Sequence, residues 1–150
     1  MDVNEVIREM IVLLHHEATR YSISIRAELA DDTPEAIADR VQLQQVLMNL
    51  MLNAIEAMKE TAGELTIKSQ LDQDDQLLIS VSDTSVGLPA EKADQIFDAF
   101  FTTKPQGTGM GLAITRSIVE SHGGQLWATA NGERGATFHF TLPREMGAHA

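Results

Sequence analysis

The chain has 150 residues, of which 43% are apolar, and its formal net charge is −11. This length suits one domain with a sizeable core, and the apolar stretches are too short and interrupted to span a bilayer. The acidic balance argues against broad nucleic-acid binding and against an anionic membrane surface, and the absence of cysteine excludes disulfides and thiolate metal sites. Because the chain opens on acidic and polar residues without a signal-peptide pattern, we expect a cytoplasmic protein.

The periodicity of apolar residues predicts the elements in chain order. Asn4 is expected to cap a first helix of about a dozen residues, which an alternating strand at 22–29 and a turn at 31–34 follow. A long helix covers about 39–60, and strands at 63–71 and 76–83 form an antiparallel pair around an acidic turn. A short helix at 89–97 precedes a glycine-rich segment, and a helix at 112–122 and a hairpin of strands at 125–130 and 136–142 follow it.

These elements predict an α+β fold. Their connections read as hairpins rather than βαβ crossovers, so we expect a two-layer sandwich in which helices cover one face of a mixed sheet. We expect a core over about 2–143, with Trp127 inside it, and a frayed tail after Pro143.

The long helix carries a narrow polar stripe. Apolar side chains occupy most of the circumference of residues 41–58, which predicts a buried helix. The polar remainder falls in a wedge roughly 80° wide and consists of Gln42, Gln45, Asn49, Asn53 and Glu56. Asn49 and Asn53 lie one turn apart, and amide oxygens are reasonable ligands for Mg²⁺. The stripe therefore lines a polar cavity or, alternatively, faces solvent.

The segment 94–112 has glycines at alternate positions 107, 109 and 111, directly before a predicted helix. Glycines let a backbone approach a ligand closely, and a helix start attracts phosphate. Lys104 can neutralise further charge. The segment matches neither a P-loop nor a dinucleotide fingerprint. It predicts a mobile loop that closes over a polyphosphate; the alternative is a flexible turn before an ordinary helix.

Asp83 ends a predicted strand, and Gly87 follows in the next loop. A buried carboxylate there could accept a hydrogen bond from an exocyclic amine and so select adenine, while Gly87 would allow a flat ring to approach. The alternative is a strand that ends in a polar turn.

Five segments in order resemble the conserved blocks of the sensor histidine kinase catalytic domain, a member of the GHKL ATP-binding superfamily. They are QVLMNLMLNAIEAM (45–58), DTSVGLP (83–89), IFDAFFTTKP (96–105), GTGMGLAI (107–114) and GGQLWATANGERGATFHFTLP (123–143). The resemblance covers nearly the whole chain and implies a Bergerat-type fold that binds ATP and Mg²⁺.

The resemblance also implies roles for single residues. Asn53 would coordinate a Mg²⁺ ion that bridges the phosphates, with Asn49 beside it. Asp83 would bind the adenine amino group, with Thr137 in the same network and Gly87 flanking the base.

Residues 88–108 resemble the ATP lid, which aromatic packing anchors and whose Lys104 reaches the phosphates. The anchoring side chains would be Phe97, Phe100 and Phe101. The phosphate-binding turn and helix start would comprise Gly107, Thr108, Gly109, Met110, Gly111 and Leu112.

Two positions depart from the family pattern. Ser85 stands where a glycine is common in the adenine loop, which puts the conformation of that loop in question. Glu56 and Ala57 stand where many relatives carry a basic residue and an aromatic. Lys104 is therefore the expected main cation for the phosphates, with Arg116 or Lys59 as further candidates.

The reaction class follows from Asn49. In the hydrolases of the superfamily a glutamate at this position activates water, and an amide cannot accept that proton. We therefore expect slow hydrolysis and transfer of the γ-phosphate to an external histidine, in line. His15 and His16 lack the proline of a phosphoacceptor box, so the acceptor should lie on a separate dimerisation and phosphotransfer domain, which a response regulator then reads.

Two alternatives stay open at this point. One is a stand-alone regulator resembling the anti-sigma serine kinases of the same superfamily. The other is a degenerate domain that only scaffolds, which Ser85 and the missing second cation leave open.

Overall fold

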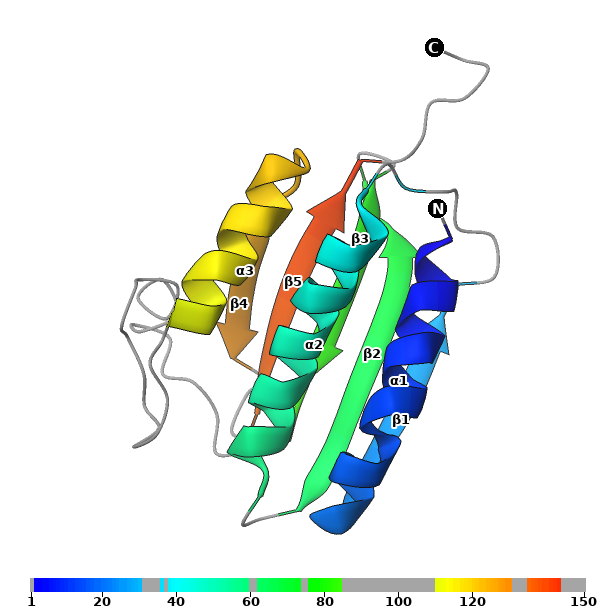
Figure 1. Cartoon of the computed structure of the whole chain (residues 1–150), viewed down its shortest axis with the longest axis vertical. Helices are drawn as coiled ribbons and strands as arrows, with labels where there is room; N and C mark the ends of the chain where they lie inside the picture. The colour runs from blue at the N-terminus through cyan, green and yellow to red at the C-terminus, as the bar shows by residue number, and fades with distance from the viewer. Residues whose placement is uncertain are drawn as a thin grey trace.

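The computed structural model describes residues 2–30, 36, 38–59, 62–73, 76–84, 110–130 and 135–143. Three helices cover one face of a five-stranded mixed sheet (Figure 1), which confirms the predicted α+β sandwich. The elements are α1 (Val3–Arg20), β1 (Ile23–Leu29), α2 (Arg40–Ala57), β2 (Gly63–Leu71), β3 (Leu77–Ser82), α3 (Met110–Ser121), β4 (Leu126–Ala130) and β5 (Ala136–Leu142). In this described part of the chain, no helix is both long and apolar enough to cross a membrane.

The strand order is β1-β2-β3-β5-β4. The pairs β2–β3 and β4–β5 are antiparallel, as the two predicted hairpins require, and β3 also pairs antiparallel with β5. Among the described strand pairs, only β1 and β2 run parallel, because α2 crosses over between them. The expectation of hairpins rather than βαβ crossovers is therefore wrong for this connection. The edge strand β1 presents charged side chains, and Arg26 and Glu28 form an ion pair of 3.6 Å. This topology brings the end of β3 next to the start of β5, in the sheet whose one face α2 and α3 cover (Figure 1).

The first helix begins two residues earlier than expected. Asp2, rather than Asn4, caps α1, and its carboxylate accepts a hydrogen bond from the backbone N–H of Glu5 (3.3 Å). Asn4 is buried instead: its Nδ2 donates to Ala30 O (2.7 Å), and its Oδ1 accepts from Ser69 Oγ (2.7 Å). Both residues are good cap formers, so local sequence could not separate them. The long-range partners in β2 and after β1 decide which one turns inward.

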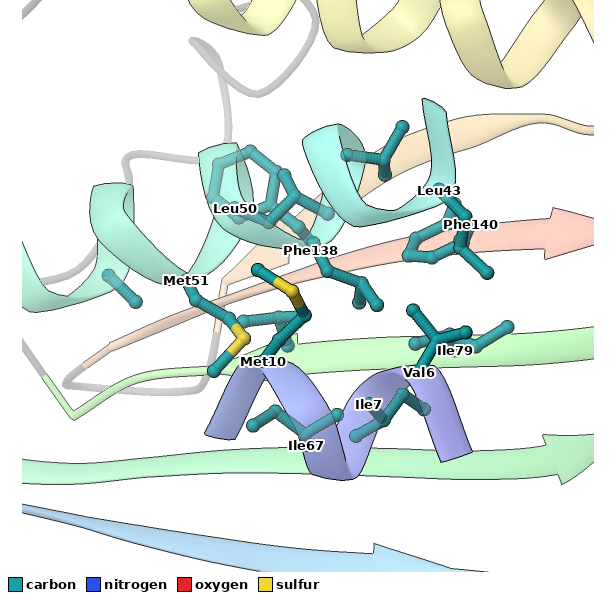
Figure 2. Close-up of a cluster of buried hydrophobic side chains, with 14 of the residues drawn as sticks. Val6, Ile7, Met10, Leu43, Leu50, Met51, Ile67, Ile79, Phe138 and Phe140 are labelled. Carbon is teal, nitrogen blue, oxygen red and sulfur yellow. The ribbon is translucent and has the colours of Figure 1, made fainter. Parts of the chain in front are cut away.

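One apolar core joins the helices to the sheet. Figure 2 shows side chains of α1 and α2 meeting those of β2, β3 and β5, among them Val6, Ile7, Met10, Leu43, Leu50, Met51, Ile67, Ile79, Phe138 and Phe140. The core residues of α2 recur at helical spacing, but Val41 is 71% exposed and Leu52 is 40% exposed. The expectation that α2 is buried nearly all round is therefore wrong. The helix buries one broad face and leaves the rest open.

The opposite face of the sheet carries a polar cluster. Its His139 lies between two hydroxyls, with Ser80 Oγ 3.0 Å from Nδ1 and Thr129 Oγ1 2.9 Å from Nε2. The Trp127 ring stacks on His139 with centroids 5.3 Å apart. Trp127 is 36% exposed, so the expectation of a core tryptophan is wrong. Its position in β4 pairs it with His139 on the face away from the helices.

Several sequence expectations fall outside the described residues. These are the turn at 31–34, the short helix at 89–97, the lid at 88–108 with its three phenylalanines, and the tail after Pro143.

Candidate functional site

The two asparagines of the polar stripe lie on the side of α2 that faces α3. Asn49 Nδ2 donates to Thr115 Oγ1 on α3 over 3.0 Å, and the Thr115 side chain is fully buried. Asn53 lies one turn further along α2 and is half-buried. This placement favours the lined site over the solvent-facing stripe for these two residues. The exposed Gln42, Gln45 and Glu56 fit the solvent-facing alternative.

Asp83 lies directly after β3 and is 4% exposed. Its backbone N–H donates to Ala136 O (2.9 Å), and its Oδ1 accepts from the backbone N–H of Ala136 (3.2 Å). The carboxylate thus replaces a carbonyl at the end of the β3–β5 ladder. A carboxylate has about four acceptor positions, so this bond leaves it able to accept from a ligand as well.

Gly135 makes this arrangement possible. Its φ of 90° lies in a region that L side chains rarely adopt, and a Cβ there would lie 2.0 Å from Asp83 O. Only glycine lets the start of β5 approach Asp83 this closely.

The structure brings the backbone of Ala136, rather than the side chain of Thr137, against Asp83. Thr137 pairs with Ser82 across the sheet and donates to Ser82 Oγ (2.9 Å). Side chains alternate along a strand, so Thr137 shares the helix-free face with His139, whereas Phe138 enters the core. The expected part of Thr137 in an adenine-binding network stays a prediction. The alternation in ATFHFTL predicts this face for Thr137, since the two phenylalanines mark the face of β5 that points into the core.

Met110, Gly111 and Leu112 form the first turn of α3, as the predicted helix start requires. The first N–H groups of a helix lack intrahelical partners and carry partial positive charge, which suits an anion. The remaining predicted contacts lie outside the described residues: Ser85, Gly87, Lys104, Gly107, Thr108 and Gly109.

The two further cations are held by glutamates of their own helical segments. Lys59 Nζ lies 2.7 Å from Glu56 Oε2 and 5.2 Å from the centre of the Tyr21 ring. The hydrogen bond to Glu56 raises the pKa of Lys59. Arg116 Nε lies 3.3 Å from Glu120 Oε2. Tyr21 caps the end of α1, so Lys59 sits on the α1 side of α2, away from the contact between Asn49 and α3.

The donor chemistry of the site fits a hard divalent cation. Asn49 and Asn53 bring amide oxygens, which Mg²⁺ accepts together with phosphate oxygens and water. Across the described ranges, no group of three His, Cys, Asp or Glu side chains could hold a metal by itself. An ion at this site would therefore need the oxygens of a ligand such as a polyphosphate.

Comparisons with known proteins agree with this arrangement. The family model "Histidine kinase-, DNA gyrase B-, and HSP90-like ATPase" matches residues 38–146. The sensor protein FixL of Bradyrhizobium diazoefficiens is 45% identical over 127 residues, which cover 84% of this chain and 25% of that protein. Such curated relatives are long, and the chain spans between 15% and 31% of their lengths.

Solved structures share the fold. The nucleotide-free catalytic domain of the histidine kinase ThkA has a TM-score of 0.85 and 40% sequence identity, with 96% of this chain and 93% of that chain covered. Full-length ShkA in complex with AMPPNP has a TM-score of 0.86 and 28% identity, with 96% of this chain and 30% of that chain covered. The chain therefore belongs to the family of histidine kinase-, DNA gyrase B- and HSP90-like ATPases, within which it is a sensor histidine kinase ATP-binding domain.

Proposed function

We propose that this domain binds Mg-ATP between α2, the end of β3 and the start of α3, and presents the γ-phosphate to a histidine on another domain. The single observation that carries the proposal is the hydrogen bond between Asn49 and Thr115. It ties the asparagine stripe to the helix whose first turn contains Met110, Gly111 and Leu112. The neighbour ShkA was solved with AMPPNP, an ATP analogue, which supports the choice of nucleotide.

The residues of the candidate site have separate parts in this proposal. Asp83 accepts a hydrogen bond from the adenine amino group, and the first turn of α3 donates backbone N–H groups to the phosphates. Asn53, with Asn49 beside it, would hold the Mg²⁺ ion, which neutralises charge that develops on the phosphates. Lys104, Gly107, Thr108 and Gly109 are proposed to complete the phosphate contacts, and Gly87 to flank the base.

The proposed reaction is phosphoryl transfer rather than hydrolysis. A histidine nitrogen forms a bond to the γ-phosphorus while the bond to the β–γ bridging oxygen breaks, and ADP leaves. Asn49 is an amide and cannot take a proton from water, so attack by water lacks a general base. We infer that the acceptor histidine lies on a dimerisation and phosphotransfer domain of a longer sensor kinase, and that a response regulator receives the phosphoryl group from it.

Nucleotide binding tests the proposal directly. Titration of the domain with AMPPNP and MgCl₂ in a calorimeter should give one saturable site. Asn53→Ala should weaken the affinity about tenfold or more, because it removes a metal ligand, and Asp83→Asn should weaken it in the absence of metal as well. Gln70→Ala on the helix-free face serves as the control and should bind like the unchanged protein. A folded domain that gives neither heat nor a thermal shift with Mg-AMPPNP would contradict the proposal.

A further inference from the structure

Thr115 is a buried polar residue to which the proposed function gives no role of its own beyond its contact with Asn49. It lies in the second turn of α3, its side chain has no exposed surface, and its hydroxyl oxygen accepts the hydrogen bond from Asn49 Nδ2. Burial of a hydroxyl costs free energy unless it is hydrogen-bonded, so the pair holds both side chains in place. An apolar residue of the same shape would fill this position without that cost.

The hydrogen bond with Thr115 determines whether the amide nitrogen or the amide oxygen of Asn49 faces α3. The amide nitrogen can only donate, and the amide oxygen can only accept. A threonine hydroxyl in a helix commonly donates to the carbonyl one turn earlier, which leaves its oxygen as an acceptor. Such a hydroxyl selects the amide nitrogen of Asn49 as its partner, and the amide oxygen then points away from Thr115.

We propose that Thr115 is a positioning residue that orients Asn49 so that its Oδ1 faces the metal side of the nucleotide site. This inference rests on the proposed function, because it assigns the Asn49 oxygen to the Mg²⁺ ion or to its bound water. Without the Thr115 hydroxyl, the amide of Asn49 turns freely about its last torsion and presents nitrogen or oxygen. An N–H directed at a cation is repulsive, so the ion loses affinity while the nucleotide itself keeps its other contacts.

Two variants of Thr115 separate the hydroxyl from the volume of the side chain. Thr115→Val keeps the branched shape and removes the hydroxyl, whereas Thr115→Ser keeps the hydroxyl and removes a methyl group. Each is titrated with AMPPNP twice, once with MgCl₂ and once with EDTA, and its melting temperature is measured without nucleotide. The ratio of the two dissociation constants reports the contribution of the metal.

The unchanged protein should bind more tightly with Mg²⁺ than with EDTA. Thr115→Val should lower this metal-dependent gain about tenfold and leave the EDTA affinity within about twofold, whereas Thr115→Ser should retain the gain. Loss of affinity by the same factor with and without Mg²⁺ in Thr115→Val would show a merely structural role and overturn the inference. An unchanged metal-dependent gain in affinity in Thr115→Val would also overturn the inference. Absence of nucleotide binding in the unchanged protein would instead contradict the proposed function.

Discussion

At the scale of single residues, His139 shows how partial burial lowers the pKa of a side chain on the sheet face away from the helices. Burial lowers the pKa of His139, because the charged imidazolium loses water that the neighbouring hydroxyls replace only in part. In the unfolded chain the imidazole takes up its proton near pH 6.5. Below that pH the unfolded chain therefore binds more protons than the folded protein. Linkage then requires the free energy of unfolding to fall as the pH drops through this window.

His139→Gln removes this contribution. The melting temperature of the unchanged protein should fall between pH 7.5 and pH 5.5, and the fall should be smaller in His139→Gln. The exposed His16 on α1 provides the control, since His16→Gln should keep the full pH dependence. Melting curves at the two pH values decide the matter. Equal pH dependence in His139→Gln and the unchanged protein would show that His139 does not contribute it.

The local sequence predicted which residues belong to the candidate site better than it predicted which residues contact one another. The stripe of amides, the place of Asp83 at the end of a strand and a helix that begins near Leu112 were predicted from the sequence, and the structure begins this helix two residues earlier. The choice of Asp2 rather than Asn4 as the cap of α1 was not predicted, because it depends on the contact of Asn4 with Ser69, which lies far along the chain.

At the scale of elements, α2 and α3 are joined at two points along their contact. One is the bond between Asn49 and Thr115, and the other is His122, directly after α3. His122 Nδ1 lies 2.8 Å from Ile118 O, and Nε2 accepts the backbone N–H of Asp39 over 3.0 Å. A carbonyl can only accept, so these bonds require the neutral tautomer with the proton on Nδ1. Apolar side chains line a small cavity at the His122 end of this contact, among them Leu43, Val46, Ile118 and Val119.

Removal of His122 should loosen the end of this contact that lies away from the nucleotide site. His122→Ala loses two hydrogen bonds, one of which satisfies the cap residue of α2, so we expect a loss of about 1–2 kcal/mol in the free energy of unfolding. Urea denaturation measures it. His15→Ala changes an exposed histidine of α1 and should cost less than about 0.5 kcal/mol. A His122→Ala variant as stable as His15→Ala would contradict this role.

Elements with strong periodicity were predicted well. The alternation in β2, β3 and β5 and the core spacing of α2 gave these elements and both antiparallel hairpins, because one face of each is apolar. The parallel pairing of β1 with β2 could not be predicted in this way. It depends on α2 returning the chain to the same edge of the sheet, and no local pattern encodes that path.

At the scale of the whole molecule, the domain carries a nucleotide site without an acceptor of its own in our proposal. Both candidate histidines, His15 and His16, are exposed on α1. The Asn49–Thr115 contact, by comparison, lies between α2 and α3. We expect the isolated domain to stay unlabelled when it is incubated with γ-labelled ATP and Mg²⁺.

Addition of a histidine-bearing phosphotransfer domain from a related sensor kinase supplies the acceptor. Acid-labile label should then appear on the added domain and disappear with Asp83→Asn, which serves as the control. Stable label on His15 or His16 in the isolated domain would contradict the prediction. Rapid release of phosphate that Asn49→Ala abolishes would also contradict it, because it would make Asn49 part of a hydrolase.

The family resemblance provided more of the site than the physical patterns did. A polar stripe, alternating glycines and a carboxylate after a strand each have ordinary explanations, and only their order along the chain pointed to a nucleotide site. The order of the motifs along the chain does not indicate which side chains meet. The structure shows that Thr115 accepts a hydrogen bond from Asn49 and that Gly135 allows β5 to approach Asp83 closely.

The exposed edge strand β1 affects how the protein behaves in concentrated solution. An unpaired strand edge is a template on which a second chain can add its own strand. Along β1, the exposed ion pair of Arg26 and Glu28 would lose bound water if a strand of another copy paired with this edge. This edge therefore disfavours fusion of neighbouring sheets, so concentrated solutions of the protein should resist fibril growth from this side.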